Sequence, residues 1–174
     1  QYNSKITSVF NQQPLENKIF KTLNLESDSS WSATLDSDIQ TGNSIDASYF
    51  EKKEGAWFAY VRSNGSLPAD SKEYSLRSTN GIGRSTSVSP AGNLTTINFS
   101  TNPLIDIGSD LSIGDMVYFS LSPYNTIQLA GQVVGINRDL PTGENNIIIN
   151  TGIANSNTIP IQDAYIAYIK NQEA

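Results

Sequence analysis

Apolar and polar positions alternate with a period of two along several short segments of the chain, whereas the period of 3.6 that marks an amphipathic helix does not recur. The clearest runs are residues 117–121 and 165–170, where apolar residues occupy both alternating sets. Strands with two apolar faces are covered on both sides, as in a barrel or an inter-subunit sheet. The pattern therefore predicts an all-β fold.

Further strands are predicted where β-branched and aromatic residues gather between turn signals. These segments are Lys5–Phe10, Lys18–Leu25, Trp31–Leu35, Trp57–Arg62, Gly83–Val88, Thr95–Phe99, Gln128–Ile136 and Asn146–Asn150. The turn signals are Asn64-Gly65, Asn80-Gly81, Pro90–Asn93, Ile113–Asp115 and Pro141–Gly143. Turns at this spacing predict short antiparallel strands. One short helix is predicted over Ile45–Lys53, with Asp46 as its cap and Gly55 closing it.

A polar, turn-rich stretch at residues 63–81 is typical of a connector between two lobes. We therefore predict two small antiparallel β lobes, with residues 1–77 forming an N-terminal lobe with an extended arm. Residues 78–174 are predicted to form a small five- to six-stranded β-barrel. The first lobe is less self-contained, and we expect it to need a partner chain to complete its sheet.

Composition narrows the chemistry of the chain. Of the 174 residues, 37% are apolar, which predicts small hydrophobic cores. The chain contains no Cys, the residue of thiolate metal sites, and no His, the residue that most often performs acid–base catalysis near neutral pH. A formal charge of -6 repels nucleic acid phosphates. No run approaches the roughly 18 apolar residues of a membrane span. We expect no cofactor, metal, nucleic acid or membrane partner. Because residue 1 is Gln, we also expect a chain that is either cut from a longer polypeptide or processed at its N-terminus.

Several motifs that carry chemistry elsewhere are incomplete in this sequence. Gly81-Ile82-Gly83 begins like a dinucleotide fingerprint but lacks the third glycine, so we interpret it as a turn or bulge. Asp36, Asp38 and Gly42 resemble part of a calcium loop, without its glycine at the sixth position or its glutamate at the twelfth. A two-carboxylate glycosidase drawn from Asp36, Asp38, Glu51 and Glu54 is a remote alternative. The chain is predicted not to be an enzyme.

Aromatic residues at Trp57, Phe58 and Tyr60 leave two interpretations open. They are able to stack on a sugar, and a carbohydrate- or receptor-binding module would use Trp57, Tyr60, Tyr74 or Tyr124 for this purpose. On a strand, however, alternate side chains face opposite sides, so these residues equally suit core packing. We favour packing.

Residues 20–31, FKTLNLESDSSW, and residues 50–62, FEKKEGAWFAYVR, resemble virion structural proteins of contractile-tailed phages, particularly marine myophages. The similarity extends to the Asn-x-x-Pro segment at residues 11–14, to Gly81-Ile82-Gly83, to the turn at residues 113–115 and to the closing strand that ends in residues 168–171. At residues 25–27 the chain departs from the Tyr-Glu-Gly of that family, which affects only a turn. The resemblance implies a structural component of a bacteriophage particle that is assembled in the host cytoplasm. It leaves neck, tail, baseplate and head decoration open, and we favour tail or baseplate.

Together, the open first lobe and the resemblance predict a module that packs against other virion proteins or copies of itself. Binding would use unpaired strand edges and apolar side chains. The candidate interface residues are Ile6, Val9, Phe10, Ile19, Phe20, Trp57 and Tyr60. A glycan ligand remains the alternative partner.

Overall fold

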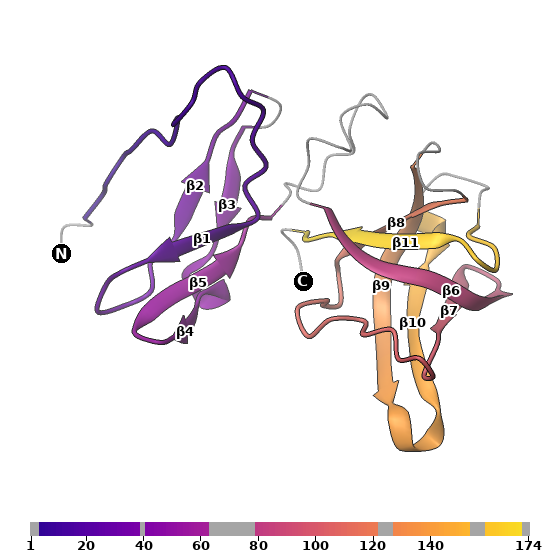
Figure 1. Cartoon of the computed structure of the whole chain (residues 1–174). Coiled ribbons are helices and arrows are strands. Elements are labelled where there is room, and N and C mark those ends of the chain that lie inside the picture. The colour runs from indigo at the N-terminus through magenta and orange to yellow at the C-terminus, as the bar shows by residue number, and fades with distance from the viewer. Residues whose placement is uncertain (1–3, 39–40, 63–78, 122–126, 154–158, 172–174) are drawn as a thin grey trace.

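The chain folds into strands and turns. The computed structural model describes residues 4–38, 41–62, 79–121, 127–153 and 159–171, and these contain no α-helix. The predicted all-β fold is therefore confirmed. Figure 1 shows two groups of strands side by side, which we call the N-terminal lobe (residues 4–62) and the barrel (residues 79–171). The expected boundary between residues 77 and 78 falls outside the described residues.

The N-terminal lobe contains two small antiparallel sheets. One has the order β1-β5-β4, formed by β1 (Thr22–Leu25), β4 (Glu51–Lys53) and β5 (Ala56–Tyr60). The other pairs β2 (Ala33–Leu35) with β3 (Asn43–Ile45). Both sheets contribute to one small core, in which Ile45, Phe50 and Ala59 are surrounded by Leu23, Leu25, Ala33, Leu35, Tyr49 and Trp57.

Two sequence predictions for this lobe are wrong. Residues 5–10 form no strand and are exposed throughout. The predicted helix over Ile45–Lys53 is reduced to a 3-10 turn, Ala47–Tyr49, in which Asp46 accepts a hydrogen bond from the Ser48 backbone amide at 2.9 Å. The chain then turns sharply at residues 54 and 55, both with positive φ, so the flanking residues pair as the β4–β5 hairpin instead of extending a helix.

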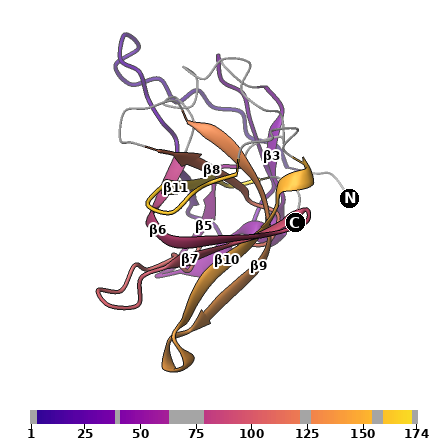
Figure 2. The same cartoon turned by 90° about the vertical axis from the view of Figure 1, so that its right-hand side faces the viewer.

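The second group of strands closes into a six-stranded antiparallel barrel, as predicted (Figure 2). Its order around the ring is β10-β7-β6-β11-β8-β9. The strands are β6 (Thr79–Ala91), β7 (Leu94–Phe99), β8 (Met116–Ser120), β9 (Gln128–Asp139), β10 (Glu144–Asn150) and β11 (Tyr165–Ile169). The hairpin of β9 and β10 projects beyond the barrel in both views (Figures 1 and 2).

Side chains fill the barrel interior, and every residue of β8 is buried. The alternating residues Val117 and Phe119 of β8 join the main core, whereas Met116 and Tyr118 point to the other face and pack with Leu129 and Ile169. This arrangement explains why apolar residues occupy both alternating sets in residues 117–121, because the strand is covered on both faces. No described helix is long and apolar enough to cross a membrane.

Glycines form tight turns at two of the positions that the sequence predicts. Gly92 joins β6 to β7 with φ 63°, and Gly143 precedes β10 with φ 81°. Asn80-Gly81 is not the predicted turn, because both residues pair with β11 inside β6. The register shifts just beyond them, where Ile166 pairs with Gly83 and Ala167 with Gly81, so the predicted bulge at residues 81–83 is confirmed. Asn64-Gly65 lies outside the described residues.

Candidate functional site

An extended arm, which we define as residues 4–21, precedes β1 and carries most of the predicted interface residues. The predicted residues on it are all solvent-exposed: Ile6 to 77%, Val9 to 84%, Phe10 to 67%, Ile19 to 46% and Phe20 to 50%. Leu15, which the sequence prediction missed, is fully exposed. Large apolar side chains in water are typical of a surface that binds another molecule.

A local turn shapes the arm without anchoring its outer half. Gln13 has φ 54°, and its carbonyl accepts hydrogen bonds from the Glu16 backbone amide at 3.0 Å and from the Lys18 ammonium at 2.7 Å. At its base, the Lys21 carbonyl accepts from the Val61 amide at 2.9 Å, while the Lys21 ammonium donates to the Thr79 carbonyl at 3.2 Å. The base of the arm is therefore fixed to both the lobe and the barrel.

The two aromatic candidates lie away from the arm. Trp57 is half-buried against the core of the N-terminal lobe, and its Nε1 donates to the Ser27 carbonyl at 3.2 Å. Tyr60 faces the barrel instead, with the Lys170 ammonium 5.6 Å from the centre of its ring. Both rings already have protein partners, which supports packing over sugar stacking. Tyr74 and Tyr124, the other candidate stacking residues, lie outside the described residues.

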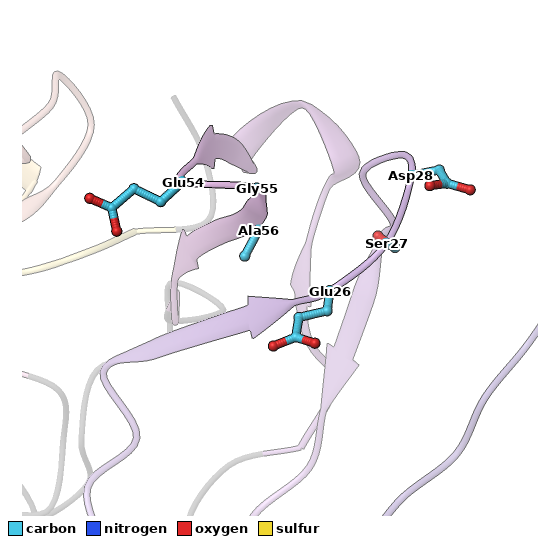
Figure 3. A pocket seen from close by; sticks show the side chains of 6 residues that line it. All are labelled: Glu26, Ser27, Asp28, Glu54, Gly55 and Ala56. Atoms are coloured by element: carbon cyan, nitrogen blue, oxygen red, sulfur yellow. The ribbon is translucent and has the colours of Figure 1, made fainter.

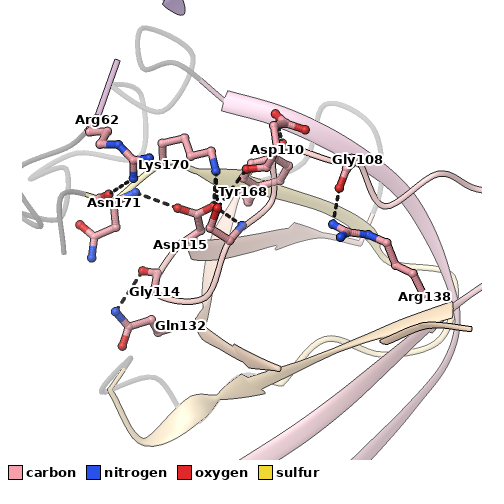
Figure 4. Close-up of polar contacts among 11 residues, drawn as sticks. Arg62, Gly108, Asp110, Gly114, Asp115, Gln132, Arg138, Tyr168, Lys170 and Asn171 are labelled. Atoms are coloured by element: carbon pink, nitrogen blue, oxygen red, sulfur yellow. Dashed lines mark hydrogen bonds and ion pairs between the residues drawn. The ribbon is translucent and has the colours of Figure 1, made fainter. Parts of the chain in front are cut away.

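A buried polar cluster joins the N-terminal lobe to the barrel (Figure 4). At its centre Lys170, just after β11, forms an ion pair with Asp115 at 3.0 Å, and the two side chains are 3% and 2% exposed. Asp115 also accepts hydrogen bonds from the Ser112 amide at 2.9 Å and the Asn171 amide at 3.1 Å. A buried ion pair persists when its remaining hydrogen-bonding capacity is satisfied in this way.

Arg62 makes the connection from the lobe side. Its guanidinium lies 3.7 Å from the ring centre of Tyr49 and donates through Nη1 to the Asn171 carbonyl at 2.9 Å. Because Arg62 and Tyr49 belong to the lobe and Asn171 to the barrel, this side chain couples the two. The sequence prediction did not identify Arg62, Asp115 or Lys170, since an isolated charge in a sequence carries no sign of its distant partner.

Two tyrosines of this junction surround Asp110. Tyr168 donates its hydroxyl proton to the Asp110 carboxylate, and burial, followed by this hydrogen bond, raises the pKa of Tyr168 well above its usual range. Burial and the neighbouring charge of Asp110 also raise the pKa of Tyr60. Both phenols are therefore held in their neutral form, which suits a hydrogen-bonded joint.

Three carboxylates line a shallow hollow in the N-terminal lobe, but they do not converge on one point. It is lined by Glu26, Ser27, Asp28, Glu54, Gly55 and Ala56. Figure 3 shows the side chains of Glu26, Asp28 and Glu54 spread in different directions around it. Among the described residues, no group of three His, Cys, Asp or Glu side chains is placed to hold a metal ion.

Residues 1–64 match the family model of the Crassvirus muzzle protein C-terminal domain. The match covers the arm and the N-terminal lobe, and it indicates a phage virion structural protein. This agrees with the phage resemblance of the sequence at the level of a virion protein. The finer resemblance to contractile-tailed marine myophages is not confirmed by this match. No curated protein and no solved structure matches the chain.

Proposed function

We propose that the chain is a non-enzymatic assembly module of a bacteriophage particle, which packs against other virion subunits through its N-terminal arm. The observation that carries this proposal is the row of exposed apolar side chains at Ile6, Val9 and Phe10, in a part of the chain that matches a virion protein family. Burying such side chains in a neighbouring subunit supplies about 1.5–3 kcal/mol each.

The arrangement suits assembly because the parts of the chain have different roles. The barrel has a closed ring of strands and a filled core, so it offers a rigid body without an open sheet edge. The arm offers apolar side chains and, in residues 4–12, a backbone that pairs with no described strand. The polar junction around Lys170 and Arg62 fixes the base of the arm relative to the barrel.

The resemblance of the sequence supports a tail or baseplate position for the module, with assembly in the host cytoplasm. Partners are then other virion proteins or copies of the same chain. Neither nucleic acid nor membrane is required by this proposal.

Incorporation into particles tests the proposal. We expect purified phage particles to contain the chain by mass spectrometry, and Phe10→Asp to reduce its amount per particle at least severalfold, since a buried carboxylate opposes packing. Leu140→Asp is the matched control, because Leu140 is 46% exposed on the projecting β9–β10 hairpin. Equal incorporation of the Phe10 variant and the control would rule out packing through the arm.

A further inference from the structure

Residues Lys5–Phe10 have the composition of a strand but no strand partner. Their sequence, KITSVF, is rich in β-branched and aromatic residues and alternates between two faces. The structure nevertheless leaves all six residues outside any sheet and exposed. Natural sequences tend to agree locally with the structure they finally adopt. A segment that favours a strand and lacks a neighbour is therefore suited to pairing with another sheet.

The N-terminal lobe contains a sheet that is one strand short. Strands β2 and β3 pair only with each other among the described strands, which leaves an open outer edge on each. A two-stranded sheet is marginally stable, and a third strand is the usual remedy. The other sheet of the lobe protects its β4 edge with charge, since Glu51 and Lys53 form an exposed ion pair there at 3.0 Å. The β2–β3 sheet, whose strands carry no charged residue, is therefore a better acceptor than the β4 edge.

Charge favours contact between the arm and the lobe. Residues 4–21 carry three Lys and one Glu, a formal charge of +2, in a chain whose formal charge is -6. Residues 22–62 carry seven acidic and three basic side chains, a formal charge of -4. A basic segment approaching an acidic surface gains attraction and a faster encounter, both of which weaken as salt is added.

The arm does not satisfy this sheet within its own chain. Residues 4–17 are all exposed, and the turn at residues 13–16 leaves the outer half standing away from the lobe as an open loop (Figure 1). Nine extended residues, 4–12, reach roughly 30 Å, which is enough to cross to an adjacent molecule. A second copy of the chain presents the same acidic lobe and the same incomplete sheet.

We propose that residues 5–10 of the arm add as a strand to the open β2–β3 sheet of a second copy of this chain. This inference rests on the proposed function, because it names the partner of the same arm. Main-chain hydrogen bonds supply part of the affinity, and the side chains of Ile6 and Phe10, which share one face of the strand, supply the remainder as they leave water. Repeating the contact from copy to copy joins chains head to tail, in a ring or a filament.

Disulfide trapping between separate variants tests the pairing directly, because the natural chain contains no Cys. Thr34→Cys places a thiol at an exposed position in the middle of β2. It is mixed under mild oxidation with Ser8→Cys or, separately, with Val9→Cys. Adjacent residues of a strand face opposite sides, so we expect one of these two arm variants to form the mixed disulfide several times faster than the other.

The control for trapping is Ser89→Cys, an exposed position on barrel strand β6. We expect it to form the mixed disulfide no faster than random collision allows. Equal rates for Thr34→Cys and Ser89→Cys would overturn the proposal. The double variants Ser8→Cys/Thr34→Cys and Val9→Cys/Thr34→Cys test whether the arm pairs with β2 of its own chain. A disulfide that forms in them at high dilution, and only within one molecule, would also overturn the proposal.

Sedimentation of the full chain gives a second readout. We expect self-association that weakens roughly tenfold or more on Ile6→Asp, a factor equivalent to about 1.4 kcal/mol, and that weakens with added salt. Leu140→Asp should leave it unchanged. Self-association that Ile6→Asp does not alter would contradict the proposed contact.

The failure of this inference is distinguishable from the failure of the proposed function. A chain that stays monomeric at high concentration, yet still enters phage particles in a manner that Phe10→Asp abolishes, would overturn the pairing of two copies and leave the assembly role standing. A chain that enters particles regardless of Phe10→Asp would overturn both.

Discussion

Lys170 and Asp115 form an ion pair at 3.0 Å that is almost entirely shielded from water. Lys170 also donates to the Ser112 hydroxyl at 3.0 Å, and its ammonium lies near the rings of Tyr60 and Tyr168. The pair connects the end of β11 to the turn before β8, two strands that are neighbours in the barrel. The charges therefore fix the end of the barrel against which the N-terminal lobe rests.

Removing Asp115 should be strongly destabilising. In Asp115→Ala the buried Lys170 ammonium loses its counterion, and two backbone amides, those of Ser112 and Asn171, lose their acceptor. We expect the free energy of unfolding to fall by about 3–5 kcal/mol, as for other broken buried pairs. Urea denaturation measures this change. A loss below about 1 kcal/mol would show that the pair is already hydrated.

Lys170→Met provides the comparison for this pair. The thioether side chain occupies a similar volume without charge, and Asp115 keeps its two backbone donors. We expect Lys170→Met to destabilise the chain less than Asp115→Ala, because fewer buried polar groups are left without partners. The opposite order would indicate that the ion pair, and not the backbone contacts of Asp115, dominates.

The sequence predicts the barrel better than the lobe for a physical reason. The strands Gln128–Asp139 and Glu144–Asn150 contain clusters of β-branched residues, at 133–136 and 147–149, and are joined by a glycine turn, so local composition and tertiary packing agree. In the lobe, β3 and β4 have only three residues each, and their sequences, NSI and EKK, carry no strand signal. Those strands exist because partners across the sheet pair with them.

The sequence likewise predicts one part of the candidate site and misses the other. Ile6, Val9 and Phe10 are exposed, as contact with a partner requires, and their role as interface residues stays a prediction. Tyr60 proves to be at a junction between lobe and barrel, which periodicity within one strand does not reveal. Contacts such as that of Arg62 with Asn171 join residues more than a hundred positions apart. Only the folded chain brings such groups together.

Gly131 should tolerate no side chain. It has φ 154°, and a Cβ at this position would lie 2.3 Å from the backbone carbonyl oxygen of Asn150 in the neighbouring strand. The backbone would have to separate, at the β9 position where the register with β8 shifts. We expect Gly131→Ala to lower the free energy of unfolding by about 3 kcal/mol or more. Thermal or urea denaturation gives the value.

Gly92→Ala separates the effect of contact from that of backbone conformation. Gly92 also has positive φ, at 63°, but nothing lies within 4 Å of the position that an alanine methyl group would occupy there. We expect a cost of about 1–2 kcal/mol, from the left-handed conformation alone. If the two alanine variants are equally stable, the close approach of Gly131 to Asn150 is not what requires glycine.

Arg62→Ala should loosen the joint between the N-terminal lobe and the barrel while leaving the barrel folded. The variant removes the hydrogen bond to the Asn171 carbonyl and the stacking on Tyr49. Hydrogen exchange should therefore speed up in β1 and β5, and change little in β9 and β10. Arg138→Ala is the control, since Arg138 is an exposed residue that bonds within the barrel. Uniform acceleration across both parts would contradict a role confined to the joint.

Stability should decline at alkaline pH because of Tyr168. Burial and the hydrogen bond to Asp110 raise the pKa of this phenol in the folded chain, whereas in the unfolded chain it ionises near its usual pKa of about 10. The contribution of Tyr168 to the free energy of unfolding is therefore complete below about pH 10. It is lost as the pH rises from there toward the folded-state pKa, because the unfolded chain releases a proton that the folded chain retains. We expect Tyr168→Phe to be less stable than the natural chain at neutral pH but to show a shallower decline above pH 10. Urea denaturation as a function of pH measures both slopes, and parallel slopes would show that another group controls the alkaline transition.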